Sequence, residues 1–241
     1  MRWLEPVAYC ESDGFCRDIL EARMLDGALD RAPVAHDIRD FHWTEHVDAV
    51  CAGFPCQDIS AAGAQIGFDG SRSSLLFEFM RVVRESTPAS VLLENVVAIR
   101  SSKMANVWRQ VLSSLVSAGY TPFWVSVAAK HVGSPQCRLR WFCVAVRSIH
   151  ECRSALAPLV GRVSAEEWAM ECRGPWNNTA HVAKCDSLLL SVGPFWQERL
   201  RALGNAVVPQ QGALAFRLLV HTCSGFDACQ GAGAFSIALD A

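Results

Sequence analysis

One stretch predicts the fold of this chain: Asp48-Ala49-Val50-Cys51-Ala52-Gly53-Phe54-Pro55-Cys56-Gln57-Asp58-Ile59-Ser60. Its first four residues form a short, mostly apolar run, typical of a strand that is covered on both faces. Gly53 and Pro55 end that strand in a tight turn, and Pro55 holds Phe54 in an extended conformation. Cys56 therefore lies on a rigid loop just past a strand end, where a thiol can meet a substrate. The alternative for Cys56 is a small buried hydrophobic residue, and this stretch alone does not separate the two.

Length and composition limit the class of protein. The 241 residues, about half of them hydrophobic, can form one large domain with a full core. We expect no membrane span and no signal peptide. Eleven cysteines without a C-x-x-C pair favour reduced thiols in a cytosol over a disulfide framework or a zinc site. The net charge of −2 neither indicates nor excludes nucleic-acid binding, since a basic cleft can lie on a neutral protein.

Two acidic residues near the N-terminus follow predicted strand ends. Residues 6–10 predict a short strand that leads to Glu11, and a helical pattern follows. An acid just past a strand end is where doubly wound α/β folds hold a ribose hydroxyl. Residues 35–39 give a weaker indication of the next strand end, with Asp37 facing the same crevice. The alternative for both side chains is an ordinary solvated carboxylate.

A second buried strand is predicted over residues 89–96, and it ends in Glu94-Asn95. Helical patterns flank this strand, one from Ser73 to Pro88 and one over residues 104–118. A carboxylate at the end of an apolar strand is partly desolvated, so the pKa of Glu94 should rise and let it donate a proton at neutral pH. The alternative is a helix-capping role for Glu94.

Two arginines share one face of a later strand. Residues 121–128 alternate as a strand, and residues 134–146 predict another, with Arg138 and Arg140 on the same side by the two-residue period. Two aligned guanidinium groups suit a phosphate or a base carbonyl. The alternative is a solvated sheet edge.

The C-terminal third has a less regular pattern. Residues 148–190 lack a clear period and predict an irregular insertion, and residues 199–209 predict a sharp turn into a helix over residues 210–221. Residues 226–239 predict a strand end, a glycine loop and a helix start, the layout of a nucleotide-binding first turn. A lone G-x-G is weak evidence, and a close-packed helix start is the alternative.

Taken together, these motifs resemble those of the DNA (cytosine-5) methyltransferases. Phe-Pro-Cys-Gln at 54–57 is similar to that family's nucleophile motif, and residues 94–96 are similar to its acid motif. Gln136-x-Arg138-x-Arg140 resembles the arginine motif, and residues 204–209 resemble the closing motif. The four motifs stand in order, with fitting spacing, over most of the chain.

The resemblance implies an α/β fold of the Rossmann-like class I S-adenosylmethionine-dependent methyltransferase type, with a mixed, mostly parallel sheet. It further implies a catalytic domain in two segments, 1–147 and 191–241, and a short target-recognition insertion at 148–190. Such a short insertion implies a short or relaxed recognition sequence of roughly two to four base pairs.

One departure from the family pattern is large. The family's cofactor loop, a D-x-F-x-G-x-G-G run, normally opens the domain, whereas its look-alike at 227–234 stands near the end of this chain. Joining the chain ends separates Gly233 from Glu11 by 19 positions: eight to the last residue, one across the join and ten more. About 20 are expected. We therefore predict a circular permutation, which is tolerated at an exposed connection. Cys229 and Ala234 replace the usual Phe and Gly, so the resemblance predicts cofactor binding less strongly than it predicts catalysis.

The resemblance also implies a mechanism and a set of site residues. Cys56 would attack C6 of a flipped-out cytosine, and C5 would then accept a methyl group from S-adenosylmethionine. Glu94 would bond the ring N3 and the exocyclic amine, and Arg140 would hold the base carbonyl, with Arg138 and Asn95 assisting. The implied cofactor-binding residues are Asp227, Gly231, Gly233, Phe235, Glu11, Asp37, Pro55, Leu75, Asn205 and Ala206; the substrate-binding residues are Gln57, Ser60 and Gln136; no metal is implied.

The partner implied by the resemblance is double-stranded DNA, bound by a monomer in the cytoplasm of a bacterium or of a phage-infected cell. Its setting would be restriction–modification or an orphan phage enzyme. An RNA cytosine-5 methyltransferase of the same architecture is an alternative that the sequence leaves open. A catalytically idle DNA-binding relative is a second, against which the intact Cys56, Glu94 and Arg140 argue. A nicotinamide oxidoreductase is a third, and it leaves Phe-Pro-Cys-Gln unexplained.

Overall fold

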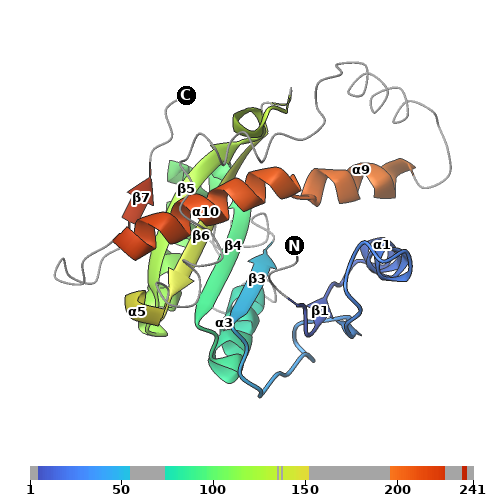
Figure 1. The fold of residues 1–241 in the computed structure, drawn as a ribbon, viewed down its shortest axis with the longest axis horizontal. Helices are drawn as coiled ribbons and strands as arrows, with labels where there is room; N and C mark the ends of the chain where they lie inside the picture. The colour runs from blue at the N-terminus through green and yellow to red at the C-terminus, as the bar shows by residue number, and fades with distance from the viewer. Residues whose placement is uncertain are drawn as a thin grey trace. The chain divides into compact units, whose positions relative to one another are not determined.

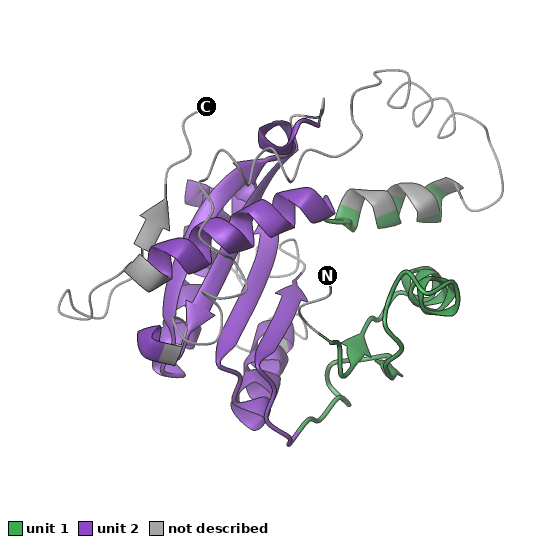
Figure 2. Cartoon of the chain, viewed as in Figure 1, with its two compact units in different colours: residues 1–43, 179–207 green, residues 44–178, 208–241 purple. Residues whose placement is uncertain are grey.

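A computed structural model of the chain divides into two compact units (Figure 2). Unit 1 comprises residues 1–43 and 179–207, and unit 2 comprises residues 44–178 and 208–241. The predicted insertion lies outside the described residues from position 152 on, so the predicted domain boundaries stay a prediction. The structure describes residues 5–54, 74–134, 136, 138–151, 196–225 and 235–237.

A five-stranded sheet forms the centre of unit 2 (Figure 1). Its strand order is β3-β4-β6-β5-β7. β6 runs antiparallel to both of its neighbours, while β3 pairs parallel with β4 and β5 pairs parallel with β7. Four strands therefore run in one direction, which confirms the predicted mixed, mostly parallel sheet. The strands are β3 (Ala49–Gly53), β4 (Ser90–Val96), β5 (Thr121–Ala128), β6 (Leu139–Val146) and β7 (Phe235–Ile237).

Helices cover both faces of this sheet. Phe123, Val125 and Val127 of β5 belong to the buried cluster that α10 closes, whereas the ring of Trp124 meets Trp108 of α4 edge-on, with centroids 5.5 Å apart. Because successive side chains of a strand point to opposite faces, α10 and α4 lie on opposite sides of β5. The helices of unit 2 are α3 (Ser74–Ser86), α4 (Ala105–Ser117), α5 (Ile149–Glu151) and α10 (Pro209–Gly225), with 3-10 turns η1 (Val97–Arg100), η2 (Ser102–Met104) and η3 (Ala129–Val132).

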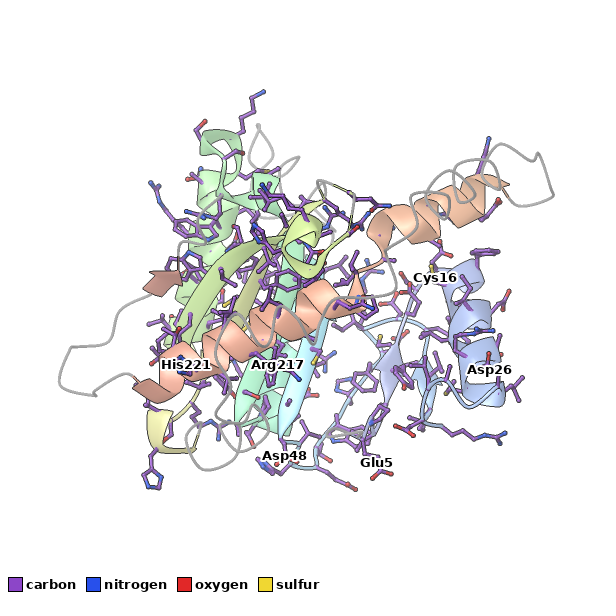
Figure 3. The ribbon with its side chains drawn as sticks, turned by 45° about the horizontal axis from the view of Figure 1, so that its top comes forward. Glu5, Cys16, Asp26, Asp48, Arg217 and His221 are labelled. Atoms are coloured by element: carbon purple, nitrogen blue, oxygen red, sulfur yellow. The ribbon has the colours of Figure 1, made fainter. Side chains whose placement is uncertain are left out.

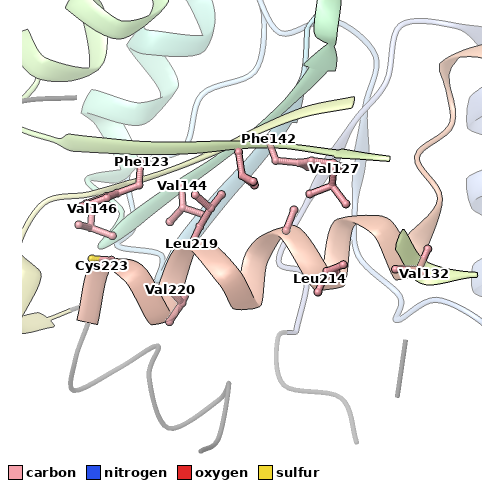
Figure 4. Close-up of a cluster of buried hydrophobic side chains, with 12 residues drawn as sticks. Phe123, Val127, Val132, Phe142, Val144, Val146, Leu214, Leu219, Val220 and Cys223 are labelled. Atoms are coloured by element: carbon pink, nitrogen blue, oxygen red, sulfur yellow. The ribbon is translucent and has the colours of Figure 1, made fainter. Parts of the chain in front are cut away.

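The apolar stripe of α10 explains its position. Leu214 and Leu219 belong to the same buried cluster as Phe142 and Val144 of β6 (Figure 4). Arg217 and His221, labelled along the helix in Figure 3, lie outside that cluster. One helix face therefore packs on the sheet, as apolar spacing of three and four residues requires.

Most elements predicted from periodicity are confirmed. The predicted strand at 121–128 coincides with β5, and the predicted helix at 104–118 differs from α4 by one residue at each end. Gly119 follows α4 with a φ of 86°, a left-handed conformation that suits glycine at the end of a helix.

The predicted helix start after the glycine loop is wrong. Residues 235–237 form β7, which pairs with Phe123–Val125 of β5. The sequence Phe-Ser-Ile alternates apolar and polar residues with aromatic and β-branched side chains, and this pattern fits a sheet edge. Residues 226–234 lie outside the described part of the chain. The circular permutation therefore stays a prediction, and β7 gives it no support.

Unit 1 contains a short parallel pair, β1 (Tyr9–Cys10) and β2 (Val34–Ala35), with α1 (Gly14–Leu25) and α9 (Trp196–Asn205). The predicted turn at 199–209 is therefore wrong as far as Asn205, because that segment is helical. Asp13 caps α1 by accepting the N–H of Cys16 at 3.1 Å. The same carboxylate pairs with Arg201 of α9 at 2.7 Å. Within the described ranges, neither unit has a helix with the length and hydropathy of a membrane span.

Candidate active site

The carboxyl ends of β3 and β4 bring the acid motif to the strand that leads to Cys56. The strand register pairs Gly53 with Glu94, and a Cβ placed on Gly53 would lie 3.5 Å from Glu94 Oε2. Asn95, buried at 4% exposure, donates from Nδ2 to the carbonyl oxygen of Phe54 at 2.8 Å. This hydrogen bond holds the main chain just before Pro55. Cys56 itself lies outside the described residues.

The start of β6 adds a guanidinium group to this strand end. The antiparallel register pairs Arg140 with Val96. The side chain of Arg140 reaches Glu94, with 3.1 Å between Nε and Oε1. The two side chains are 14% and 17% exposed, so water screens this ion pair only in part. Residues from two predicted motifs therefore meet in one site.

Burial and the two arginines act on Glu94 in opposite directions. Desolvation is the largest effect and raises the pKa of the Glu94 carboxyl above its usual value, while Arg140 and Arg138 lower it. The net rise agrees with the predicted direction. Burial also lowers the pKa of Arg138, and the neighbouring charge of Arg140 adds to that effect. The site thus holds a carboxyl that takes up a proton more readily than an exposed one.

Within the described part of unit 2, two predicted residues make no contact that assigns them a role. Gln136 is exposed, and its N–H is bonded to Ser134 Oγ at 3.2 Å. Leu75 is half-buried in the first turn of α3. Their predicted roles stay predictions. The positions Pro55, Cys56, Gln57, Ser60, Asp227, Gly231 and Gly233 lie outside the described residues, as does the side chain of Phe235.

Glu11 and Asp37 stand at the carboxyl ends of the two parallel strands of unit 1. Glu11 follows β1 directly and accepts the N–H of Asp13 through Oε1 at 2.8 Å. Asp37 lies two residues past β2 and pairs with Arg39 at 3.2 Å. Neighbouring parallel strands place both residues at the same end of this strand pair, and their predicted role at a cofactor stays a prediction. Carboxylate oxygens fit the hydroxyl and amine donors of a nucleoside.

The predicted positions Asn205 and Ala206 lie at the end of α9 in unit 1. Both are exposed, and the N–H of Ala206 bonds to the carbonyl of Ala202 at 2.9 Å. No contact within the described ranges tests their predicted role at the cofactor. In the same ranges, no group of three or more His, Cys, Asp and Glu side chains is placed to hold a metal ion.

A charge asymmetry lies outside the predicted motifs. Residues 95–150 contain seven arginines and lysines and no aspartate or glutamate, in a chain whose net charge is −2. Exposed Arg100 and Lys103 follow the carboxyl end of β4, and exposed Lys130 follows the carboxyl end of β5. Because β4 and β5 run in the same direction, these three cations lie toward the sheet edge where β3 leads to Cys56. A count of charges along the sequence would have found this segment.

Comparison with known proteins gives a consistent picture. A family model for C-5 cytosine-specific DNA methylases matches residues 4–171. The type II methyltransferase M.CviJI of Paramecium bursaria Chlorella virus IL3A is 28% identical over 214 residues, which cover 88% of this chain and 52% of that protein. The type II methyltransferase M.HhaI of Haemophilus parahaemolyticus is 37% identical over 101 residues, covering 42% of this chain and 31% of that protein.

Among solved structures, the Dnmt2 methyltransferase of S. pombe is 19% identical and has a TM-score of 0.45, and the match covers 62% of this chain and 47% of that one. The chain spans about half the length, or less, of these relatives.

Proposed function

Since this chain belongs to the family of C-5 cytosine-specific DNA methylases, we propose that it transfers a methyl group from S-adenosylmethionine to C5 of cytosine in double-stranded DNA. The observation that carries this proposal is the Glu94–Arg140 pair, held at 3.1 Å beside the strand that leads to Cys56. S-adenosylmethionine supplies an electrophilic methyl group when bound. The carboxylates of Glu11 and Asp37, with Asp227, Gly231 and Gly233, are our candidates to hold it.

The pair is complementary to one edge of cytosine. That edge carries a carbonyl oxygen, the ring N3 and an exocyclic amine. A protonated Glu94 donates to N3 and accepts from the amine, and the guanidinium of Arg140 donates to the carbonyl oxygen. The raised pKa of Glu94 favours the protonated form that this role requires.

Cys56 is the proposed nucleophile. Its thiolate adds to C6 of the ring, and negative charge then builds up on N3 and the carbonyl oxygen. Glu94 and Arg140 stabilise that charge because their donors are oriented before the reaction begins. After C5 has accepted the methyl group, loss of the C5 proton and elimination of the thiolate release 5-methylcytosine and restore Cys56.

Asn95 has a different role in this proposal. Its amide holds the carbonyl of Phe54, two residues before the nucleophile. We infer that Asn95 orients the Cys56 loop and does not bind the base. A shift of about 1 Å in a reacting group can lower a rate by about 10²-fold, so this hydrogen bond matters for the reaction.

The lack of aspartate and glutamate in residues 95–150 favours a polyanionic substrate. Arg100, Lys103 and Lys130 are exposed around the proposed active-site edge, and no ion pair within the described ranges neutralises them. Phosphate contacts by such side chains orient a duplex without reading its sequence. We assign sequence recognition to residues 148–190, whose small size favours a short recognition site.

We further propose that the protein acts as a monomer in the cytoplasm of a bacterium or of a phage-infected cell. Five described cysteines are free thiols, which agrees with a reducing compartment. Light scattering of the purified chain checks the oligomeric state, and a dimer mass would overturn that part of the proposal.

The decisive experiment measures transfer of labelled methyl from S-adenosylmethionine to unmethylated duplex DNA. Wild type is compared with Cys56→Ala, and Cys51→Ala on β3 is the matched control. We expect labelled 5-methylcytosine from wild type and Cys51→Ala and none from Cys56→Ala. Label in the Cys56→Ala reaction would refute the assigned nucleophile. A folded wild type that binds the cofactor but labels only RNA, or nothing, would refute the DNA reaction.

A further inference from the structure

Gln211 is a fully buried polar side chain at the start of α10, and the proposed chemistry does not use it. Its Nε2 donates to the carbonyl oxygen of Val127 at 2.6 Å and to that of Arg138 at 2.8 Å. Val127 lies near the end of β5, and Arg138 directly precedes β6. One amide therefore links α10 to both strands where they diverge.

Packing alone does not explain an amide at this position. Leucine or methionine would fill a similar volume without bringing polar atoms into the core. Both partners are carbonyl oxygens, so only the NH₂ end of the side chain can face them, and this fixes its orientation. Gln211 Oε1 is buried with no hydrogen-bond partner among the described residues, which is a cost of keeping the amide.

The main-chain segment that Gln211 holds carries the two arginines of the site. Arg138 and Arg140 lie on the same face of the strand by the two-residue period, and both charges act on Glu94. The carbonyl of Arg138 also accepts the N–H of Ala129 at 2.9 Å. Gln211 adds a second donor to that carbonyl from a separate helix, so the start of β6 is held from two directions.

We propose that Gln211 is a positioning residue that fixes the start of β6 and thereby sets the guanidinium of Arg140 against Glu94. The catalytic consequence rests on the proposed methyl transfer, while the positioning itself does not. α10 begins at Pro209, the last residue of the motif at 204–209, so these hydrogen bonds join the helix that continues from the closing motif to the arginine motif.

The test substitutes Gln211→Met, which keeps the volume and removes both donors, and Gln210→Met is the matched control one position earlier. We expect kcat to fall by about 10²-fold in Gln211→Met, as for a misplacement of about 1 Å, with KM for S-adenosylmethionine unchanged. A purely structural role would lower only the amount of folded enzyme, so kcat calculated per folded molecule, with the folded fraction taken from circular dichroism, would then equal that of wild type. Gln210→Met should behave as wild type.

A second readout does not depend on activity. Carbon-13 NMR of the Glu94 carboxyl follows its titration in the free protein. Arg140 and Arg138 lower the pKa of Glu94, so their withdrawal leaves the effect of burial unopposed. We expect the midpoint to move to higher pH in Gln211→Met and to stay in place in Gln210→Met.

An unchanged Glu94 titration in Gln211→Met would overturn the proposal, and so would a wild-type kcat. If Gln211→Met does not fold, Gln211→Asn replaces it, since its amide is one methylene too short to reach both carbonyls. An unchanged Glu94 titration in that variant would equally overturn the proposal. If wild type transfers no methyl group, the proposed function fails, whereas the NMR result still decides the positioning.

Discussion

Replacement of Arg140 by methionine tests the electrostatics on which the proposed chemistry depends. At the observed 3.1 Å, two unit charges attract by about 5 kcal/mol at an effective dielectric constant of about 20. Desolvation of both groups offsets part of this attraction. Removing one partner of a buried pair costs about 3–5 kcal/mol, because the other charge stays buried. Since the two side chains keep 14% and 17% exposure, we expect the lower end, about 3 kcal/mol.

The free energy of unfolding lost in Arg140→Met should depend on pH in a defined direction. Burial already holds the pKa of Glu94 above its ordinary value of 4.5, and without Arg140 it rises further. A carboxyl whose folded-state pKa is raised stabilises the fold below its unfolded-state pKa, and this contribution disappears as the pH rises through the folded-state pKa. Arg140→Met should therefore cost most at a pH above the raised pKa, where Glu94 is ionised. At a pH below the raised pKa, where Glu94 is protonated, about 1 kcal/mol should remain for the lost hydrogen bond.

Urea denaturation followed by tryptophan fluorescence measures both values. The control is Arg147→Met at the other end of β6, where the guanidinium lies over the Tyr120 ring and donates to its hydroxyl at 3.0 Å. That variant should lose stability equally at both pH values. The reasoning is refuted if Arg140→Met loses the same free energy of unfolding at both pH values, or more at the lower one.

Two further predictions follow from the same site. Combined Arg100→Gln and Lys103→Gln should weaken duplex DNA binding and reduce the slope of log K against log salt by about 1.8, as measured by fluorescence anisotropy. Arg84→Gln on α3 is the control, and a wild-type slope in the double variant would exclude phosphate contacts there. Asn95→Leu should lower the free energy of unfolding by about 1–2 kcal/mol and reduce kcat, with cofactor binding by calorimetry unchanged, because the carbonyl of Phe54 loses its partner. Full activity in that variant would contradict the inferred role of Asn95.

Local patterns predicted most helices and strands of unit 2 because these elements depend mainly on residues that are neighbours in the sequence. The alternation at 121–128 and the helical spacing at 104–118 each describe a segment that buries one known set of side chains. The prediction at 235–237 failed for the opposite reason. A three-residue strand at a sheet edge depends on a distant partner, here Phe123–Val125, and the neighbouring glycines of the sequence do not specify that partner.

The sequence by itself determined the family, the order of the motifs and the polar groups at the strand ends, because residue identity and spacing are local properties. Only the tertiary structure decided which of these groups meet. Glu94 and Arg140 become an ion pair through the antiparallel register of β4 and β6, and Asn95 reaches the carbonyl of Phe54 because β3 lies beside β4. The two hydrogen bonds of Gln211 exist because α10 packs on the sheet and brings the amide to two main-chain carbonyls. Strand pairing and helix packing join residues that are far apart in the chain, and no local pattern encodes those contacts.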